Sequence, residues 1–173
     1  MLSHDSSKEQ GFKLLVETYG ERLYGLIYNM VKTHNRCDDI LQESFVKVYQ
    51  NLDKYRGDSK LYTWIYRITV NETLRELKKN KVQSMSPEDI VDRLSPVAAG
   101  SELSAERIQQ ILSNAMETLP PKQRMVFNLR YYEEMKYSEM SKVLDTSEGA
   151  LKAAYHHAVK KIENYIADYG IQG

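Results

Sequence analysis

Helical periodicity extends over nearly the whole chain and is interrupted once. Apolar residues recur at spacings of three and four through residues 8–32, 38–52 and 61–81, and again from residue 103 onward. That spacing places them on one side of a helix, where they can form a buried stripe. Alternating β-branched residues between hairpin turns, which would indicate strands, do not occur in the sequence. The pattern therefore predicts an all-α protein.

The interruption covers residues 83–102, which hold serines, two prolines and a glycine but no aromatic residue. Such a composition is typical of a linker, with room for a helical turn or two between Pro87 and Leu94. This part of the chain is also acidic, since residues 83–119 carry six acidic and two basic side chains. The sequence therefore predicts two small helical domains, at residues 1–82 and 104–173, joined by a flexible linker at 83–103.

The overall composition limits the classes of protein to which the chain can belong. Its 173 residues suffice for one domain or two small ones, and 42% hydrophobic with 28% charged residues is typical of a globular protein. No apolar run approaches the roughly 20 residues that span a bilayer, and the first residues lack a signal-peptide pattern. We therefore expect a cytoplasmic protein without membrane insertion. The single cysteine, Cys37, excludes an internal disulfide and a cysteine-rich zinc site.

Positive charge is concentrated in residues 54–82, which carry eight basic and three acidic side chains although the net charge of the chain is zero. At about 100° per residue, Leu61, Ile65 and Ile68 form a core stripe, whereas Glu72 and Glu76 fall away from the basic side. That basic side consists of Trp64, Arg67, Asn71, Arg75 and Lys78. A basic row with a stacking aromatic ring is typical of proteins that hold single-stranded nucleic acid. A solvated cationic face over an aromatic core would give the same pattern, and this stretch alone does not distinguish the two.

The last third of the chain has the pattern of a helix-turn-helix. A short amphipathic helix at residues 137–144 precedes Asp145, a residue type that tolerates the backbone angles of a tight turn. Thr146 or Ser147 can cap a second helix over residues 148–165. In such a motif the start of the second helix enters the major groove of DNA. The residues near base edges would be Lys152, Ala153, His156 and His157. A plain helical hairpin is the alternative.

Two long runs of sequence resemble one family. The run DDILQESFVKVYQNLDKYRGDSKLYTWIYRITVNETLRELKK resembles region 2 of the extracytoplasmic-function sigma factors, and LPPKQRMVFNLRYYEEMKYSEMSKVLDTSEGALKAAYHHAVKKI resembles their region 4. The similar blocks span roughly residues 12–82 and 104–166. The resemblance implies a promoter-specificity subunit that directs bacterial RNA polymerase to −35/−10 promoters in response to stress or envelope signals. The second block alone also fits other transcriptional helix-turn-helix proteins.

The resemblance also implies roles for individual residues of region 2. The second helix of the family's region 2 docks on the β′ clamp of RNA polymerase, and the matching positions are Asp38, Asp39, Gln42 and Glu43. The following loop and helix open the −10 element and hold a flipped base. The residues similar to those around the base pocket are Tyr55, Trp64, Arg67 and Asn71. The residues expected to hold the adjacent backbone are Arg75, Lys78 and Lys79.

Region 4 of the family binds the −35 element as duplex and contacts the polymerase β flap. The similar positions here are Arg130, Lys152, Ala153, His156 and His157. The family commonly has Ser-Arg after the lysine and a further arginine three residues on, where this chain has Ala153, Ala154 and His157. Each missing arginine removes a candidate phosphate or guanine contact. The departures therefore predict a different −35 preference or a weaker grip there.

The family also implies a further partner, an anti-sigma factor that is often anchored in the membrane and would hold the chain there. The tail at residues 167–173 is short, so we expect no extra sensory domain. No catalytic constellation occurs: His156 and His157 are adjacent on one helix and point about 100° apart, which suits metal ligation poorly. We therefore expect no enzyme activity, metal, cofactor or small-molecule substrate. Two alternatives stay open, a sigma-factor mimic that sequesters an anti-sigma protein and a stand-alone helix-turn-helix regulator.

Overall fold

The computed structural model describes residues 2–81 and 104–168, and all of its regular structure in those ranges is helical. This confirms the predicted all-α class. The predicted linker at 83–103, with its turn at Pro87–Leu94, lies outside the described residues. The elements are α1 (Leu2–Val31), α2 (His34–Asn51), the 3₁₀-helix η1 (Leu52–Lys54), α3 (Leu61–Lys81), α5 (Ala105–Glu117), α6 (Pro121–Tyr131), α7 (Tyr137–Leu144) and α8 (Glu148–Asp168).

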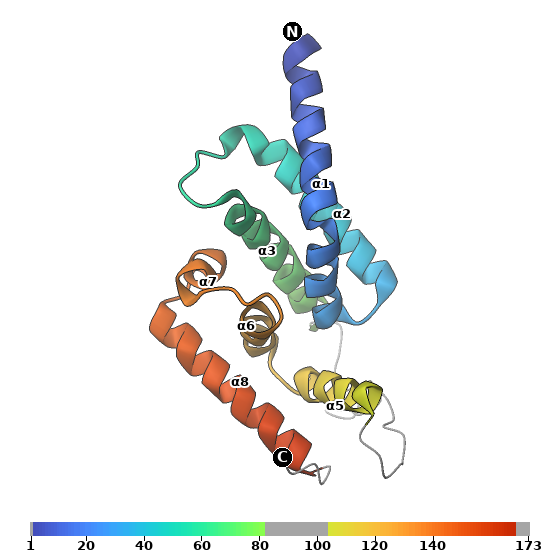
Figure 1. Cartoon of the computed structure of the whole chain (residues 1–173), viewed down its shortest axis with the longest axis vertical. Helices are drawn as coiled ribbons and strands as arrows, with labels where there is room; N and C mark the ends of the chain where they lie inside the picture. Colours follow the sequence, from blue (N-terminus) through green and yellow to red (C-terminus); the bar gives the residue numbers. More distant parts are fainter. Residues whose placement is uncertain (1, 82–103, 169–173) are drawn as a thin grey trace.

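The first three helices form one bundle (Figure 1). α1 and α2 run antiparallel, and α3 packs against both. Their shared core contains the fully buried side chains of Leu23, Leu26 and Ile27 on α1, Val48 on α2 and Ile65 on α3. Farther toward the start of α1 the ring of Phe12 meets the rings of Phe45 and Tyr49 edge-on. The predicted apolar stripes therefore do form the core.

The turn between α1 and α2 is shorter than the sequence predicted. The helical spacing of the sequence ended at residue 32 and resumed at residue 38, so the second helix was expected to begin at Asp38. Instead Lys32 adopts a left-handed backbone (φ 56°) and Thr33 an extended one, so α2 already begins at His34. Asp38 and Asp39 consequently lie beyond the first turn of α2, where the helix dipole stabilises a carboxylate less than in the first turn.

Cys37 is fully buried beside this turn, and its thiol donates a hydrogen bond to the carbonyl of Tyr24 at 3.3 Å. Burial and the neighbouring Asp38 carboxylate raise the pKa of the Cys37 thiol to about 11. The thiol therefore stays protonated at neutral pH and is a poor nucleophile.

The second group of helices begins with a capped α5. The hydroxyl of Ser104 accepts a hydrogen bond from the backbone N–H of Arg107 at 3.2 Å, as an N-cap serine does. Pro121 starts α6, because proline suits the first helical position. A separate small core joins α5, α6 and α8, and consists of Ala115, Met116, Leu119, Phe127, Ala158 and Ile162.

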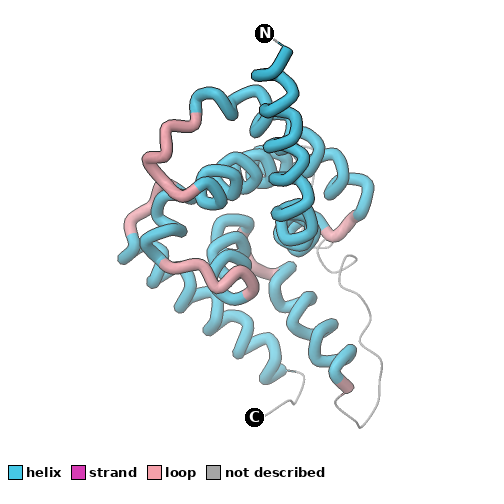
Figure 2. Tube along the Cα trace, turned by 45° about the horizontal axis from the view of Figure 1, so that its top comes forward, coloured by secondary structure: helices cyan, strands magenta, loops and turns pink. Residues whose placement is uncertain are grey.

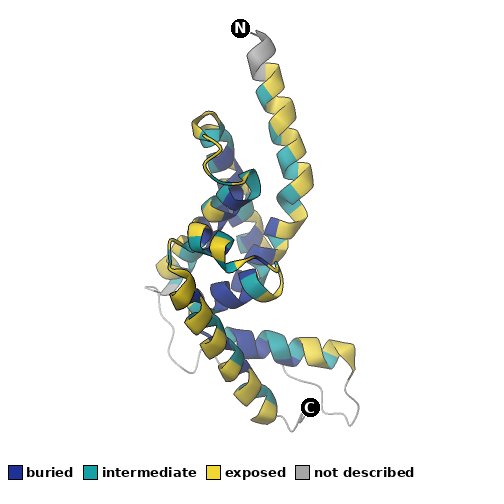
Figure 3. Ribbon diagram, turned by 60° about the vertical axis from the view of Figure 1, so that its left-hand side comes forward, coloured by how far each residue is buried: buried dark blue, intermediate teal, exposed yellow. Residues whose placement is uncertain are grey.

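α7 and α8 form the predicted helix-turn-helix. Asp145 sits between them in the left-handed conformation (φ 50°, ψ 49°). Of the two candidate caps, Ser147 fills the role, since its hydroxyl accepts from the backbone N–H of Ala150 at 3.2 Å. Figure 2 shows α8 running past the end of the bundle as a long, straight helix. Its outer side is exposed along most of its length (Figure 3).

The two groups of helices are packed against each other. α7 lies against α3, and α6 lies against α1 and α3. One hydrophobic core therefore runs from the first group into the second and includes Met125, Leu129, Met140 and Val143 of the second group. Among the described residues, no helix combines the length and the apolar character needed to cross a membrane.

Candidate nucleic-acid interface

The predicted basic row lies on the solvent side of α3. Arg67, Asn71, Arg75 and Lys78 are exposed, and so is the neighbouring Lys79, while Trp64 is half-buried. The opposite side of α3 is buried and contains Thr63, Tyr66, Thr69, Val70 and Thr73. The helical wheel therefore placed the basic row on the exposed side of α3, although its core stripe missed the buried threonines.

The loop before α3 supports the tryptophan of this row. The ring of Tyr55 packs against Trp64, with ring centroids 5.3 Å apart and planes at 45°. The Tyr55 hydroxyl donates a hydrogen bond to the carbonyl of Ser59 and so closes the loop on itself. Gly57 has a φ of 77°, which a residue with a Cβ adopts only with strain. The loop and α3 together hold two aromatic rings in one place.

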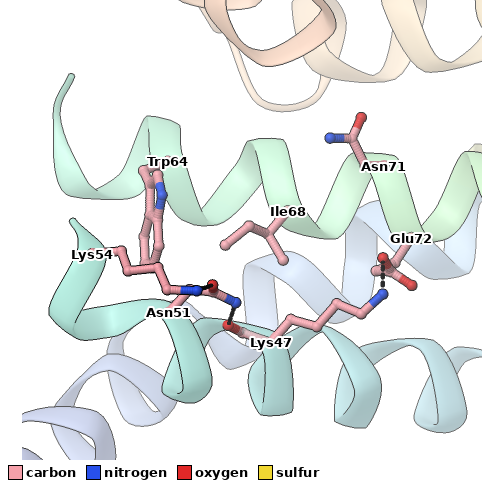
Figure 4. Close-up of a pocket in the computed structure, with 7 residues that line it drawn as sticks. All are labelled: Lys47, Asn51, Lys54, Trp64, Ile68, Asn71 and Glu72. Carbon is pink, nitrogen blue, oxygen red and sulfur yellow. Dashed lines mark hydrogen bonds and ion pairs between the residues drawn. The ribbon is translucent and has the colours of Figure 1, made fainter. Parts of the chain in front are cut away.

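A cavity of about 290 Å³ opens beside Trp64, between α3 and the end of α2 (Figure 4). Trp64 and Asn71 are the members of the predicted base-binding set that line it. Neither Tyr55 nor Arg67 lines the cavity, although the ring of Tyr55 packs against that of Trp64. Figure 4 shows Ile68 and Glu72 directed toward α2, whereas the amide of Asn71 points away from α2. The complete lining is Lys47, Asn51, Lys54, Trp64, Ile68, Asn71 and Glu72.

Three lining residues come from α2 and η1 and were missed from the sequence: Lys47, Asn51 and Lys54. The side-chain amide of Asn51 donates to the carbonyl of Lys47 at 2.8 Å and accepts from the Lys54 ammonium at 3.1 Å. These contacts orient the amide of Asn51 and hold the ammonium of Lys54 at the mouth of the cavity. Both are groups that hydrogen-bond the edge of a nucleobase. A pattern read along one helix cannot reveal residues that a neighbouring helix contributes.

Glu72 corrects a second prediction, because it does not lie away from the basic row. Only 8% of this residue is exposed, and its carboxylate forms ion pairs with both Lys47 and Arg75. Arg75 is three residues farther along α3, a spacing that brings side chains together on a helix surface. Part of the positive charge counted in the sequence is therefore offset at the floor of the cavity.

The carboxylates of α2 form a separate acidic surface. Asp38, Asp39, Gln42 and Glu43 are all exposed, on consecutive turns of one helix. Glu43 also contacts the Lys47 ammonium at 3.7 Å. Asp39 and Glu43 line a second cavity, of about 420 Å³, between α2 and α3. The acidic surface and the basic row thus lie on either side of the same groove.

The start of α8 presents the predicted residues of the second domain. Lys152, Ala153, His156 and His157 are exposed. Arg130 is half-buried, because its guanidinium donates to the carbonyl of Met135 at 3.2 Å and lies over the ring of Tyr137. The Lys152 ammonium lies 5.7 Å from the centre of the same ring. The imidazoles of His156 and His157 lie 6.1 Å apart. In residues 2–81 and 104–168 no group of three or more His, Cys, Asp or Glu could hold a metal ion.

Comparisons with known proteins agree with this arrangement. The family models described as Sigma-70 region 2 and Sigma-70, region 4 match residues 15–82 and 109–162. The ECF RNA polymerase sigma-E factors of Salmonella typhimurium and Escherichia coli K12 are 30% identical over 168 residues, spanning 91% of this chain and 87% of each relative. The chain belongs to the extracytoplasmic-function group of the sigma-70 family. It is a promoter-specificity sigma factor, and the helices α1–α3 and α5–α8 contain its regions 2 and 4.

Solved structures with the same fold include two protein complexes. One is CnrH in complex with the cytosolic domain of CnrY, with a TM-score of 0.69, 20% identity, and coverage of 92% of this chain and 90% of CnrH. The other is RpoE in complex with the anti-sigma factor NepR from Bartonella quintana, with a TM-score of 0.70, 18% identity, and coverage of 91% and 98%. At these identities the likeness concerns the fold alone.

Proposed function

We propose that this sigma factor works through three surfaces, one for RNA polymerase core and two for promoter DNA. The observation that carries the proposal is the cavity beside Trp64, which joins an aromatic wall to amide and ammonium groups at the edge of an exposed basic row. A surface of this kind suits one unpaired base with its backbone. The domain division at residues 1–82, 83–103 and 104–173 follows from the separate tasks of the two groups of helices.

The first DNA surface captures a base of the −10 element. Extruding a base from duplex costs a few kcal/mol, and stacking on an aromatic side chain returns about 1–3 kcal/mol. Trp64, backed by Tyr55, supplies the stacking face. Asn71, Asn51 and Lys54 supply hydrogen bonds to the base edge. The backbone beside the base is held by the cations Arg67, Arg75, Lys78 and Lys79.

The second DNA surface is the start of α8, which enters the major groove of the −35 element. Lys152 contacts phosphate or guanine, and the methyl group of Ala153 suits contact with thymine. His156 and His157 offer hydrogen bonds at positions where Arg would add a full charge. Arg130 fixes the turn before α7 and contacts the DNA backbone at the edge of this surface. With Ala153, Ala154 and His157 in these positions, the grip on the −35 element is weaker than an arginine-bearing helix would give.

The exposed face of α2 is the surface for RNA polymerase core. It consists of the exposed residues Asp38, Asp39, Gln42 and Glu43, which offer three carboxylates and one amide to a partner. Such a surface fits a basic stretch of the β′ clamp through contacts that act within about 10 Å at ordinary salt. Region 4 adds a contact to the β flap. The likeness to RpoE, solved in complex with the anti-sigma factor NepR, supports an anti-sigma factor as a further partner.

The chain acts in this scheme as a binding subunit in the cytoplasm, held at the membrane only when an anchored anti-sigma factor binds it. In this scheme the chemistry belongs to the polymerase, and the chain contributes binding surfaces. A mimic that only sequesters an anti-sigma factor would have no use for the cavity beside Trp64. A stand-alone regulator would have no use for the carboxylates of α2.

Run-off transcription with purified core polymerase and the full chain tests the proposal. A library of promoter fragments should give transcripts with defined start points only when both proteins are present. The double variant Asp39→Asn, Glu43→Gln should lose most of this activity while keeping its helical content. Glu163→Gln, an exposed carboxylate on α8, serves as the matched control and should retain activity. Absence of any promoter-dependent transcript from the library would refute the proposal.

A further inference from the structure

The start of α1 contacts the segment that leads from α2 into the loop before α3. The ammonium of Lys8 lies 2.6 Å from the carboxylate of Asp53, which belongs to η1. The same ammonium lies 4.8 Å from the centre of the Tyr49 ring, in the last turn of α2. Only 20% of the Lys8 side chain is exposed, although the start of α1 extends past the other helices (Figure 1). Lys8 therefore contacts both the end of α2 and the short helix that follows it.

Phe12 contacts the same end of α2 from one turn farther along α1. Its ring meets the rings of Phe45 and Tyr49 edge-on, with centroids 6.0 and 5.0 Å away. Residues four apart on a helix lie on the same side, so Lys8 and Phe12 form one contact surface. An edge-on ring and a nearby cation are both arrangements that the charge distribution of an aromatic ring favours. The first turns of α1 are therefore anchored on the end of α2.

η1 depends on polar contacts for its position. None of the three residues Leu52–Lys54 is buried, so the hydrophobic core does not fix this turn. The backbone N–H of Tyr55 donates to the carbonyl of Leu52 at 3.2 Å and closes the turn on itself. The ion pair of Asp53 with Lys8 ties η1 to a helix that is far away in the sequence. Asp53 is 68% exposed, and ion pairs with an exposed partner contribute little to stability. Loss of this pair should therefore shift η1 rather than unfold the domain.

The residues beside Asp53 belong to the base-binding cavity. Asn51 and Lys54 line it opposite α3, whereas Asp53 and Lys8 do not line it. A displacement of η1 would move the amide of Asn51 and the ammonium of Lys54 relative to the ring of Trp64. Groups that bind a ligand must be held within about 0.5 Å of their productive positions. The contact at Lys8 can therefore affect base capture without touching DNA.

We propose that Lys8 is a positioning residue for the −10 base. By holding Asp53, its ammonium fixes η1, and with η1 the part of the cavity wall that faces Trp64. The start of α1 thus acts on promoter opening through the structure of region 2. This inference deepens the proposed function and rests on it, because the cavity must be the place where the base is captured.

Trp64 is the only tryptophan in the chain, so its fluorescence reports on the cavity in the free protein. Quenching by acrylamide measures how accessible the indole ring is. Lys8→Met keeps an unbranched side chain but removes the charge. It should raise the quenching constant about twofold, because an ion pair with an exposed partner shifts such an equilibrium only a few-fold. Lys8→Arg keeps the charge and should behave as the wild type.

Lys13→Met is the matched control on the same helix. The Lys13 side chain is 79% exposed and meets Glu17, one turn farther along α1, at 3.9 Å. Its replacement should leave the quenching constant unchanged. Circular dichroism of all variants verifies that the helices remain folded.

Promoter opening by the full chain with core polymerase tests the positioning role itself. On a promoter fragment from the run-off library, permanganate reactivity should develop about two- to fivefold more slowly with Lys8→Met than with the wild type. Affinity for core polymerase and binding to −35 duplex should not change, whereas a merely structural role would lower all three. Asp53→Asn should give the same loss. The double variant should lose no more than either single one, because both changes remove the same contact.

The outcomes separate the positioning role from the proposed function, because the quenching measurement uses neither polymerase nor promoter. Unchanged quenching in both Lys8→Met and Asp53→Asn, or additive losses in the double variant, would overturn the positioning role even where the wild type transcribes normally. Increased quenching with an unchanged rate of opening would also overturn it, since the ion pair would then fix η1 without serving the base. A wild type that opened no promoter would refute the proposed function and the positioning role together.

Discussion

The two helices that present DNA surfaces, α3 and α8, differ in how the rest of the molecule supports them. α3 is enclosed by α1, α2 and α7, and its DNA side forms one wall of a cavity whose other wall is α2. α8 is exposed along its outer side, and Lys152 and His156 are among its exposed residues. The enclosed helix can surround a single base, whereas the open helix can enter the groove of an intact duplex.

Electrostatics separates the two helices in the same way. On α3, Glu72 is buried between Lys47 and Arg75 and offsets their charge. On α8, the ammonium of Lys152 lies over the ring of Tyr137 and keeps its positive charge available. Affinity at α3 should therefore depend on shape and stacking, and affinity at α8 on charge. The following variants test this division.

The largest effect should come from Trp64→Ala, which removes the stacking wall of the cavity. Promoter opening should fall about 10- to 100-fold, since one base loses about 1–3 kcal/mol of stacking. Permanganate reactivity of unpaired thymines measures opening. Binding to −35 duplex should not change. Arg67→Ala is the matched control, because Arg67 lies on the same side of α3 but does not line the cavity. Equal losses for the two variants would mean that charge, not shape, governs this surface.

A smaller effect should follow from Glu72→Gln, which breaks the ion pairs at the floor of the cavity. The free energy of unfolding should fall by about 1–2 kcal/mol, a value reduced by the half-exposed position of Arg75. The two released cations should strengthen non-specific binding to single-stranded DNA and steepen its dependence on salt by about one unit.

Glu76→Gln is the control for that variant, because the Glu76 carboxylate is more exposed and meets Lys79 only at 4.0 Å. It should change neither stability nor the salt dependence measurably. A Glu72→Gln protein with unchanged salt dependence would show that Lys47 and Arg75 already contact DNA in the presence of Glu72. Titrations of a labelled oligonucleotide at several salt concentrations provide the measurement.

These two helices also show how far the sequence alone could lead. The exposed row of α3 and the turn at Asp145 were predictable, because helical spacing and turn residues act within a few positions of the chain. Asn51 and Lys54 were not, because their place at the cavity depends on which helix lies beside α3. The burial of Tyr66 was also missed, since a polar residue on a helix looks solvated until another part of the chain, here Glu133, covers it. Contacts between elements, unlike the elements themselves, leave no local signal.

On the open helix, Lys152→Ala should weaken binding to −35 duplex about three- to tenfold. The slope of affinity against salt should become smaller by about one unit, because one phosphate contact is lost. Lys160→Ala removes an exposed lysine two turns farther along α8 and should have a much smaller effect. If Lys152→Ala bound −35 duplex as the wild type does, region 4 would contact DNA through another surface.

The smallest effect concerns the buried side of α3, about 200° around the helix from Asn71. The hydroxyl of Thr69 is buried and has no hydrogen-bond partner among the described residues. Thr69→Val replaces it by a methyl group of similar size, so the desolvation penalty disappears and the free energy of unfolding should rise by about 1 kcal/mol. Thr73→Val is a matched substitution one turn on, where the hydroxyl donates to the Thr69 carbonyl at 2.8 Å. It loses that bond and should give no gain. Urea denaturation of the two variants decides the point, and a gain of equal size in both would show that helix propensity, and not the unpaired hydroxyl, sets the stability of this side.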